Sequence, residues 1–336
     1  MSILGADANF NFVVFAVVVM AVTLGVPAWI AGALRVFRAR TVVGPERLSR
    51  RQSPWPLVAA VGMGLMMWVM VQALYGDLRK LPAKPPGHSA PPAESVIKVM
   101  TPGDWAFVAT VPPLAGFTML WLADFFVGGT VLLDRLGFSL RRSLPGIAMG
   151  ILAAIVILPP TYFFSEATEL LYQHIHYVHP LEHELLKVMK QPENPVIQWI
   201  LVFGAAVVAP LWEEFLFRGH IQTLLKRGLV TLSSPRLPGM EGFAGYAPMN
   251  VPINPNPIPF AEIVDPPPVW QTWLAIVLTS VLFAMMHPMW MRPPIFILSL
   301  GLGYCYERTG NLWTNMTVHC LFNSVSTFVY LFVMHP

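Results

Sequence analysis

The sequence is short of charged residues and of cysteine. Only 12% of its 336 residues are charged and 55% are hydrophobic, whereas a soluble domain carries about 25% charged residues. A larger core does not explain the missing charge, because a soluble chain of this length still needs a polar surface. The two cysteines, Cys305 and Cys320, lie in apolar stretches and make no disulfide framework. We therefore expect lipid to replace water as the outer solvent, and both cysteines to be packing residues.

Long apolar runs are abundant. A membrane-spanning helix needs about 20 mostly apolar residues, and the runs that reach this length are 12–36, 55–76, 104–133, 146–167 and 195–217. Further spans are expected near 270–290 and 312–334, and a shorter run covers 295–306. Because backbone groups in lipid must pair within their own segment, helices are required. The prediction is an all-α, polytopic transmembrane bundle of about 7–8 membrane helices in the cell (plasma) membrane.

The start of the chain and its basic residues bear on orientation. The run 12–36 is too long for a signal-peptide core and no small-residue cleavage site follows it, so it is read as a retained span. Arginines gather in the first and third loops, which predicts that both are cytoplasmic and that the N-terminus lies outside. They are Arg35, Arg38, Arg40, Arg47, Arg50 and Arg51, and then Arg135, Arg141 and Arg142. The second loop also holds basic residues, so this bias is imperfect. The net charge of +3 is too small to indicate nucleic acid as a partner.

Two regions are expected. Residues 1–194 form an N-terminal membrane region that ends in an amphipathic segment at about 168–193. The histidines of this segment suit either a metal site or, as favoured here, an interfacial helix with a wet polar face; they are His174, His176, His179 and His183. Residues 195–336 form a second region, which a proline-rich loop interrupts at about 231–269.

Ionisable residues inside apolar helices are costly and indicate function. The densest group contains Glu213, Glu214 and Arg218. Glu214 and Arg218 are four residues apart, so they can pair on one helix face. Glu213 points about 100° away and has no obvious local partner. This division predicts one structural and one working carboxylate.

Two more polar groups follow on later apolar helices. His287 lies near the end of one, and His319 and Asn323 share a face of the last. A rise of about 1.5 Å per residue places each of the three groups roughly 17–25 Å from the polar end of its helix. We therefore expect them to converge on one cavity.

A carboxylate, two imidazoles and an amide together suit amide hydrolysis. Glu213 could act as the general base towards water, and His287 could hold or polarise the same water. His319 and Asn323 could donate hydrogen bonds to the oxyanion of the intermediate, at ~3 kcal/mol per donor.

Each group alone also has a purely structural interpretation. Glu214 and Arg218 could be only a buried ion pair, His287 a core histidine, and His319 with Asn323 an interhelical contact. His220 is interpreted as a helix-end residue without a role. Taken in order, the three groups predict a catalytic or catalysis-derived site.

These motifs resemble a known family. Glu-Glu-x-x-x-Arg, Phe-x-x-x-His and His-x-x-x-Asn, over roughly 195–330, are similar to the signature of the CAAX-protease and bacteriocin-processing (CPBP) family of intramembrane peptidases, which includes the type II CAAX prenyl endopeptidases. The resemblance implies a helical membrane endopeptidase that acts on membrane-associated peptides or proteins, of which a CAAX-type peptide is one possibility. The site residues that it implies are Glu213, Glu214, Arg218, His287, His319 and Asn323.

The cofactor stays open at this point. The family is often labelled metallopeptidase, and Glu213, His287 and His319 could supply the ligands of a zinc ion. No His-Glu-x-x-His motif occurs, and a metal-free glutamate mechanism explains the same residues equally well.

Two other functions use the same features. The first is a non-proteolytic CPBP scaffold that serves bacteriocin immunity or binds a partner within the membrane. The second is a transporter whose buried charges line a proton path. A transporter usually shows paired sites in both halves, whereas these charges lie only in the C-terminal half.

Overall fold

The computed structural model describes residues 55–80, 100–177, 184–190, 194–233 and 269–333, and within these ranges every regular element is a helix. The all-α prediction is confirmed there. Three of the described helices are long and apolar enough to cross a membrane, at Pro102–Phe126, Leu132–His174 and Pro195–Val230, and shorter apolar helices lie at Val58–Leu74 and Val269–Met285. The count of seven or eight spans stays a prediction. The run 12–36 and most of the loop 231–269 lie outside the described residues.

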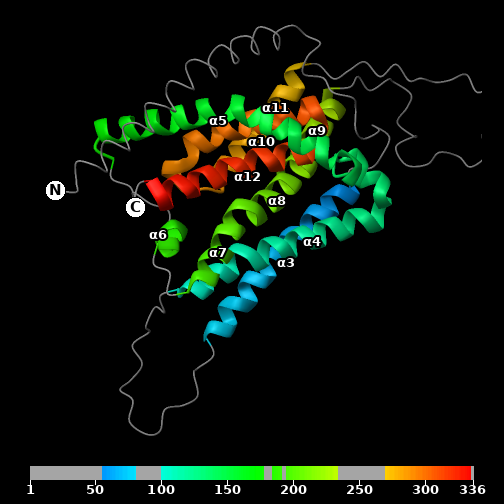
Figure 1. The fold of residues 1–336 in the computed structure, drawn as a ribbon. Coiled ribbons are helices and arrows are strands. Elements are labelled where there is room, and N and C mark those ends of the chain that lie inside the picture. Colours follow the sequence, from blue (N-terminus) through cyan, green and yellow to red (C-terminus); the bar gives the residue numbers. More distant parts are fainter. Residues whose placement is uncertain (1–54, 81–99, 178–183, 191–193, 234–268, 334–336) are drawn as a thin grey trace, which may run out of the picture.

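Helices α3 (Trp55–Lys80) and α4 (Pro102–Arg135) lie side by side along one flank of the bundle (Figure 1). Thr101 starts α4 with a capping box: its hydroxyl accepts from the Asp104 N–H at 3.2 Å, and the Asp104 carboxylate accepts from the Thr101 N–H at 2.7 Å. These bonds satisfy donors that the first helical turn leaves unpaired. The start of α4 is therefore set by its own sequence.

On the other flank, α5 (Ser143–His174) packs along α11 (Arg292–Thr309) and α12 (Leu312–Phe328) (Figure 1). Its 32 residues make a helix roughly 48 Å long, well beyond a hydrocarbon core of about 30 Å. Residues 168–174 are thus the last turns of α5, and the short α6 (Glu184–Lys190) is the helix described in the rest of the segment 168–193. Because α5 packs on α11 and α12, the regions 1–194 and 195–336 share a helical core.

One long helical segment runs between these flanks. It consists of α7 (Pro195–Phe203), η3 (Gly204–Val208), α8 (Ala209–Glu214), η4 (Phe215–Gln222) and α9 (Thr223–Ser233). Both η3 and η4 are π-helical, with bonds to the carbonyl five residues back and a wider turn than in an α-helix. The remaining elements are α10 (Val269–Met285) and the short η2 (Leu140–Arg142), η5 (Met289–Met291) and η6 (Val329–Val333).

The connection from α4 to α5 meets the turn between α11 and α12. The Leu312 N–H donates to the Gly137 carbonyl at 3.0 Å, and the Tyr306 hydroxyl donates to the Leu136 carbonyl at 2.8 Å. Gly137 has φ +84°, and a Cβ there would lie 2.3 Å from the Gly310 carbonyl oxygen, so glycine is needed at this approach. The two turns therefore lie at the same end of the bundle.

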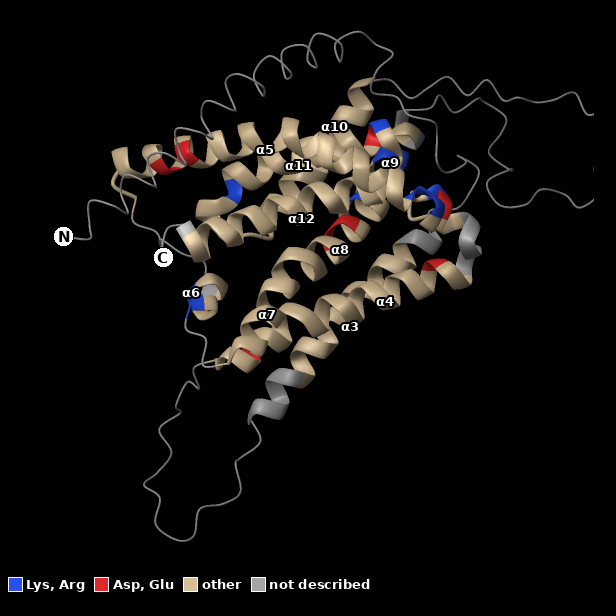
Figure 2. Ribbon diagram, viewed as in Figure 1, with Lys and Arg blue, Asp and Glu red and all other residues tan. Residues whose placement is uncertain are grey.

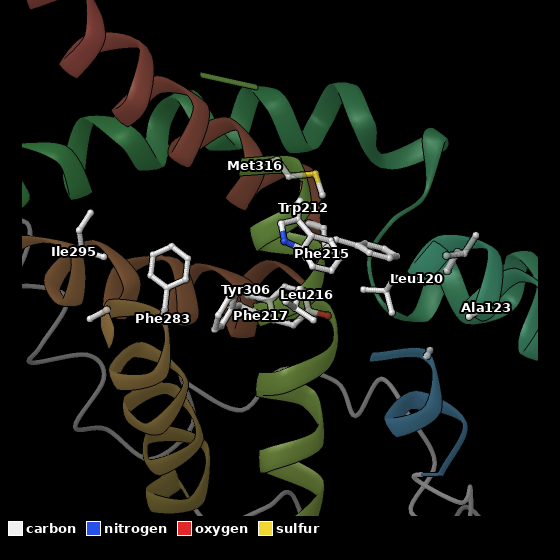
Figure 3. Packing of buried hydrophobic residues seen from close by; sticks show 14 residues of the cluster. Leu120, Ala123, Trp212, Phe215, Leu216, Phe217, Phe283, Ile295, Tyr306 and Met316 are labelled. Atoms are coloured by element: carbon white, nitrogen blue, oxygen red, sulfur yellow. The ribbon is translucent and has the colours of Figure 1, made fainter. Parts of the chain in front are cut away.

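The buried apolar cluster surrounds the middle of the long helical segment. Trp212, Phe215 and Phe217 come from α8 and η4, and they pack among side chains of α4, α10, α11 and α12 (Figure 3). Lipid tails are as apolar as these side chains, so close packing rather than escape from water holds such helices together. In the described part of the chain most charged residues lie towards helix ends, whereas the acidic residues of α8 lie in the middle of the bundle (Figure 2).

Candidate active site

Glu214, the last residue of α8, is fully buried and paired. Its Oε1 lies 3.0 Å from Nη1 of Arg218, which is also fully buried, and this confirms the predicted pair. Arg218 Nη2 donates to Ser299 Oγ of α11 at 2.9 Å, and the guanidinium lies 4.6 Å from the centre of the Phe283 ring. The charge of Glu214 is thus neutralised inside the bundle by a side chain that is itself held by two other helices.

Two residues of α12 complete the surroundings of Glu214. His319 Nδ1 lies 2.9 Å from Glu214 Oε1, and Asn315 Nδ2 donates to Glu214 Oε2 at 3.4 Å and to the Leu302 carbonyl at 2.7 Å. A buried carboxylate needs several such donors to offset the loss of water. Glu214 is therefore the carboxylate of the pair that is buried and fully provided with donors.

Glu213 has a different setting. Its side chain is 24% exposed, and its Oε2 lies 3.7 Å from Nε2 of His319. The His319 imidazole consequently lies between the two carboxylates, with Nδ1 towards Glu214 and Nε2 towards Glu213. Because Nδ1 donates to Glu214, the ring is fixed with its second nitrogen beside the accessible carboxylate.

His287 joins this group through Phe283. It lies just beyond the end of α10, where its Nδ1–H donates to the Phe283 carbonyl at 2.9 Å. The fully buried Phe283 ring is centred 5.0 Å from the His287 ring and 5.7 Å from the His319 ring. The Phe283 side chain thus contacts both histidines. It also contacts Arg218, the partner of Glu214.

Asn323 lies one turn beyond His319 on α12. Its Nδ2 donates to the Ala205 carbonyl of η3 at 2.8 Å. An amide carries two N–H groups, so one donor remains after this bond. The structure therefore brings Glu213, Glu214, Arg218 and His319 into one contact group, with Asn323 on the adjacent turn.

The sequence analysis missed two residues of the site. Asn315 could have been found, because Asn315, His319 and Asn323 recur every four residues on one face of α12. Ser299 carries no comparable signal, since its role depends on Arg218 reaching it from another helix.

The interpretation of His220 as a helix-end residue is wrong. The helical segment continues to Ser233, so His220 lies within η4 and is fully buried. Its Nε2 lies 2.9 and 3.1 Å from the two carboxylate oxygens of Asp124 on α4. The sequence did not indicate this pair because the two residues are far apart in the chain.

The arrangement of possible ligands bears on the zinc alternative. Among the described residues no group of three or more His, Cys, Asp or Glu side chains is placed to hold a metal ion. In this part of the chain Glu213, His287 and His319 are therefore not arranged as a set of three zinc ligands.

Comparison with known proteins agrees with the resemblance. Residues 258–325 match the family model of type II CAAX prenyl endopeptidases, Rce1-like. The match covers about a fifth of the chain and includes His287, His319 and Asn323, whereas the glutamates precede it. No curated protein and no solved structure matches. The matched family is a protease family, which together with the apolar helices supports a peptidase within the membrane.

Proposed function

We propose that this chain is an intramembrane endopeptidase that hydrolyses peptide bonds of membrane-associated peptides or proteins, with Glu213 as the general base. One observation carries the proposal. Two adjacent carboxylates have opposite settings, because Glu214 is buried among three donors and Glu213 is accessible beside the His319 imidazole. A site in which one carboxylate is fixed by hydrogen bonds and the other is accessible to water suits activation of that water by the accessible one.

In this proposal Glu213 accepts a proton from water while the oxygen attacks the carbonyl carbon of the peptide bond. The same carboxyl group then returns the proton to the leaving nitrogen, so that one water yields one new carboxyl group and one amine. His287 donates from Nδ1 to the Phe283 carbonyl, which leaves Nε2 as an acceptor. That nitrogen accepts the second hydrogen of the water and orients it.

The oxyanion donors are assigned to α12. His319 contributes N–H from Nε2 in its imidazolium form, because Nδ1 already donates to Glu214 and a neutral ring has only one N–H. Asn323 contributes the N–H that is not used on the Ala205 carbonyl. Each such donor contributes ~3 kcal/mol to stabilising the intermediate. Glu214 acts through His319, because its bond to Nδ1 sets the direction of Nε2.

The matched family description suggests which substrates to test first. We propose a C-terminal CAAX-type peptide anchored in the bilayer as the substrate class, with prenylation as a variable of the experiment. The purified protein in lipid nanodiscs is expected to cleave at least one peptide of a panel with and without a prenyl group. Glu213→Ala should slow cleavage by about 10²-fold or more. Equal cleavage by both proteins would overturn the proposal.

A further inference from the structure

A second buried ionisable pair includes His220, six residues after Glu214 on the same helical segment, and has no part in the proposed reaction. Asp124 of α4 is 1% exposed and His220 of η4 is fully buried. His220 Nε2 contacts both Asp124 oxygens, at 3.1 and 2.9 Å, and His220 Nδ1 lies 2.9 Å from the Phe215 carbonyl oxygen. Carboxylates inside membrane helices are costly and are rarely kept without a role.

The contacts determine where the protons lie. The Phe215 carbonyl can only accept, so His220 Nδ1 carries a proton. Nε2 lies at similar distances from both Asp124 oxygens, which suits one N–H shared by an ionised carboxylate. A carboxylic acid would donate from one oxygen and set its other oxygen against the lone pair of the ring nitrogen. These contacts point to an imidazolium paired with a carboxylate, neutral as a whole.

The pair acts on the turn that follows the glutamates. Phe215 comes directly after Glu214 and opens the π-helical η4, in which Arg218 lies. Two side chains support carbonyls of this turn from five residues ahead: His220 bonds to Phe215, and the Thr223 hydroxyl donates to the Arg218 carbonyl at 3.2 Å. Asp124 anchors one of these supports to α4. The wide turn is thus held by side chains as well as by its backbone.

The π-helical turn η4 also determines the geometry of the candidate active site. Between Glu214 and Arg218 the chain follows η4, so the geometry of this turn decides whether the Arg218 guanidinium reaches the Glu214 carboxylate at 3.0 Å. Glu214 then orients His319. On this basis we infer that Asp124 and His220 are positioning residues, which fix the π-helical turn and through it the alignment of Glu214, Arg218 and His319. This inference rests on the proposed function for its kinetic consequences.

The first test compares two substitutions of Asp124. In Asp124→Asn the amide N–H donates to an unprotonated Nε2 while Nδ1–H still donates to Phe215, so the turn keeps its support. In Asp124→Leu the leucine side chain is similar in size to aspartate but makes no hydrogen bond to His220. We expect kcat of the Asn variant within about threefold of wild type and kcat of the Leu variant about 10–100-fold lower, the loss typical of a displaced catalytic group. KM should change little in both variants, because Asp124 is buried and therefore not accessible to a substrate.

Matched controls separate positioning from general damage. Asp134→Leu makes the same substitution at an exposed position of the same helix and should leave kcat unchanged. His220→Gln keeps an N–H donor for Asp124 and removes the donor to the Phe215 carbonyl. It is expected to lower kcat, and it provides the test if Asp124→Leu does not fold. Equal kcat for wild type, Asp124→Leu and His220→Gln would overturn the positioning role.

A second measurement does not depend on activity. Nitrogen-15 NMR of histidine-labelled protein in bilayers, assigned by the loss of signal in His220→Gln, should show both ring nitrogens of His220 protonated in wild type. Asp124→Asn should show Nε2 unprotonated. An unprotonated Nε2 in wild type would overturn the ion pair. Absence of peptide cleavage by wild type together with the expected spectra would instead reject the proposed function and retain the pair.

Discussion

Two neighbouring side chains, Glu213 and Glu214, give opposite expectations on substitution. Glu213→Gln should lower kcat by about 10²–10⁴-fold and leave thermal stability unchanged, because it removes only an accessible base. Glu214→Gln should lower activity and also destabilise the protein by about 3–5 kcal/mol, because it leaves Arg218 buried without a counter-charge. Peptide hydrolysis and thermal unfolding in nanodiscs measure both. Unimpaired activity in the two variants would contradict the assignment.

The residues around Glu213 also give an expectation for metal removal. A glutamate mechanism predicts that the protein keeps full activity after strong chelation, with elemental analysis confirming that it is free of metal. Loss of activity on chelation, with recovery on adding one equivalent of zinc, would contradict the glutamate mechanism.

Among the helices, the contact between α5 and α12 depends on a glycine. A Cβ at Gly150 would lie 2.5 Å from Thr317 Cβ and 2.8 Å from the Thr314 carbonyl oxygen, which is backbone and cannot turn away. Gly150→Ala should therefore push the helices apart and destabilise the protein by about 1–3 kcal/mol, measured as a lower midpoint of thermal unfolding.

Gly62 is the matched control for this substitution. It also lies inside a helix, α3, but a Cβ there meets nothing within 4 Å. Gly62→Ala should leave stability unchanged or raise it by up to about 1 kcal/mol, because alanine is the better helix former. Equal effects of the two substitutions would show that α5 and α12 do not pack as described.

For the whole molecule, the structure predicts which positions share a side of the membrane. Arg141 and Arg308 flank the two turns that meet at Gly137, whereas Gln173 lies at the other end of α5. Single cysteines at these positions, in a background without Cys305 and Cys320, test this with an impermeant thiol reagent on intact cells. Because the arginine-rich loop is predicted to be cytoplasmic, we expect Gln173→Cys to be labelled and the other two to be protected.

Each of the other labelling patterns would contradict one part of this arrangement. The reverse pattern would overturn the orientation. Labelling of Arg141→Cys and Gln173→Cys from one side would show that α5 does not cross the membrane. Opposite sides for Arg141→Cys and Arg308→Cys would contradict the contact between the two turns.

Much of the architecture was readable from local sequence. Whether a segment of about 20 residues is stable in lipid depends on its own side chains and on its own backbone hydrogen bonds, so apolar runs predicted the long helices α3, α4, α5, α10, α11 and α12. The pairing of Glu214 with Arg218 was also predictable, because residues four apart share a helix face. The order of the three motifs sufficed for the family resemblance that the match to residues 258–325 supports.

Other features were decided only by the tertiary structure. The placement of His319 between the two glutamates, the contact of Ser299 with Arg218 and the pair of Asp124 with His220 join side chains 81 to 106 residues apart in the chain. The π-helical turns likewise have no sequence period of their own, and η4 is supported by a residue of α4. Such contacts depend on how helices pack, and in a membrane packing is set by close fit and by a few polar bonds between helices, neither of which is visible in a single segment.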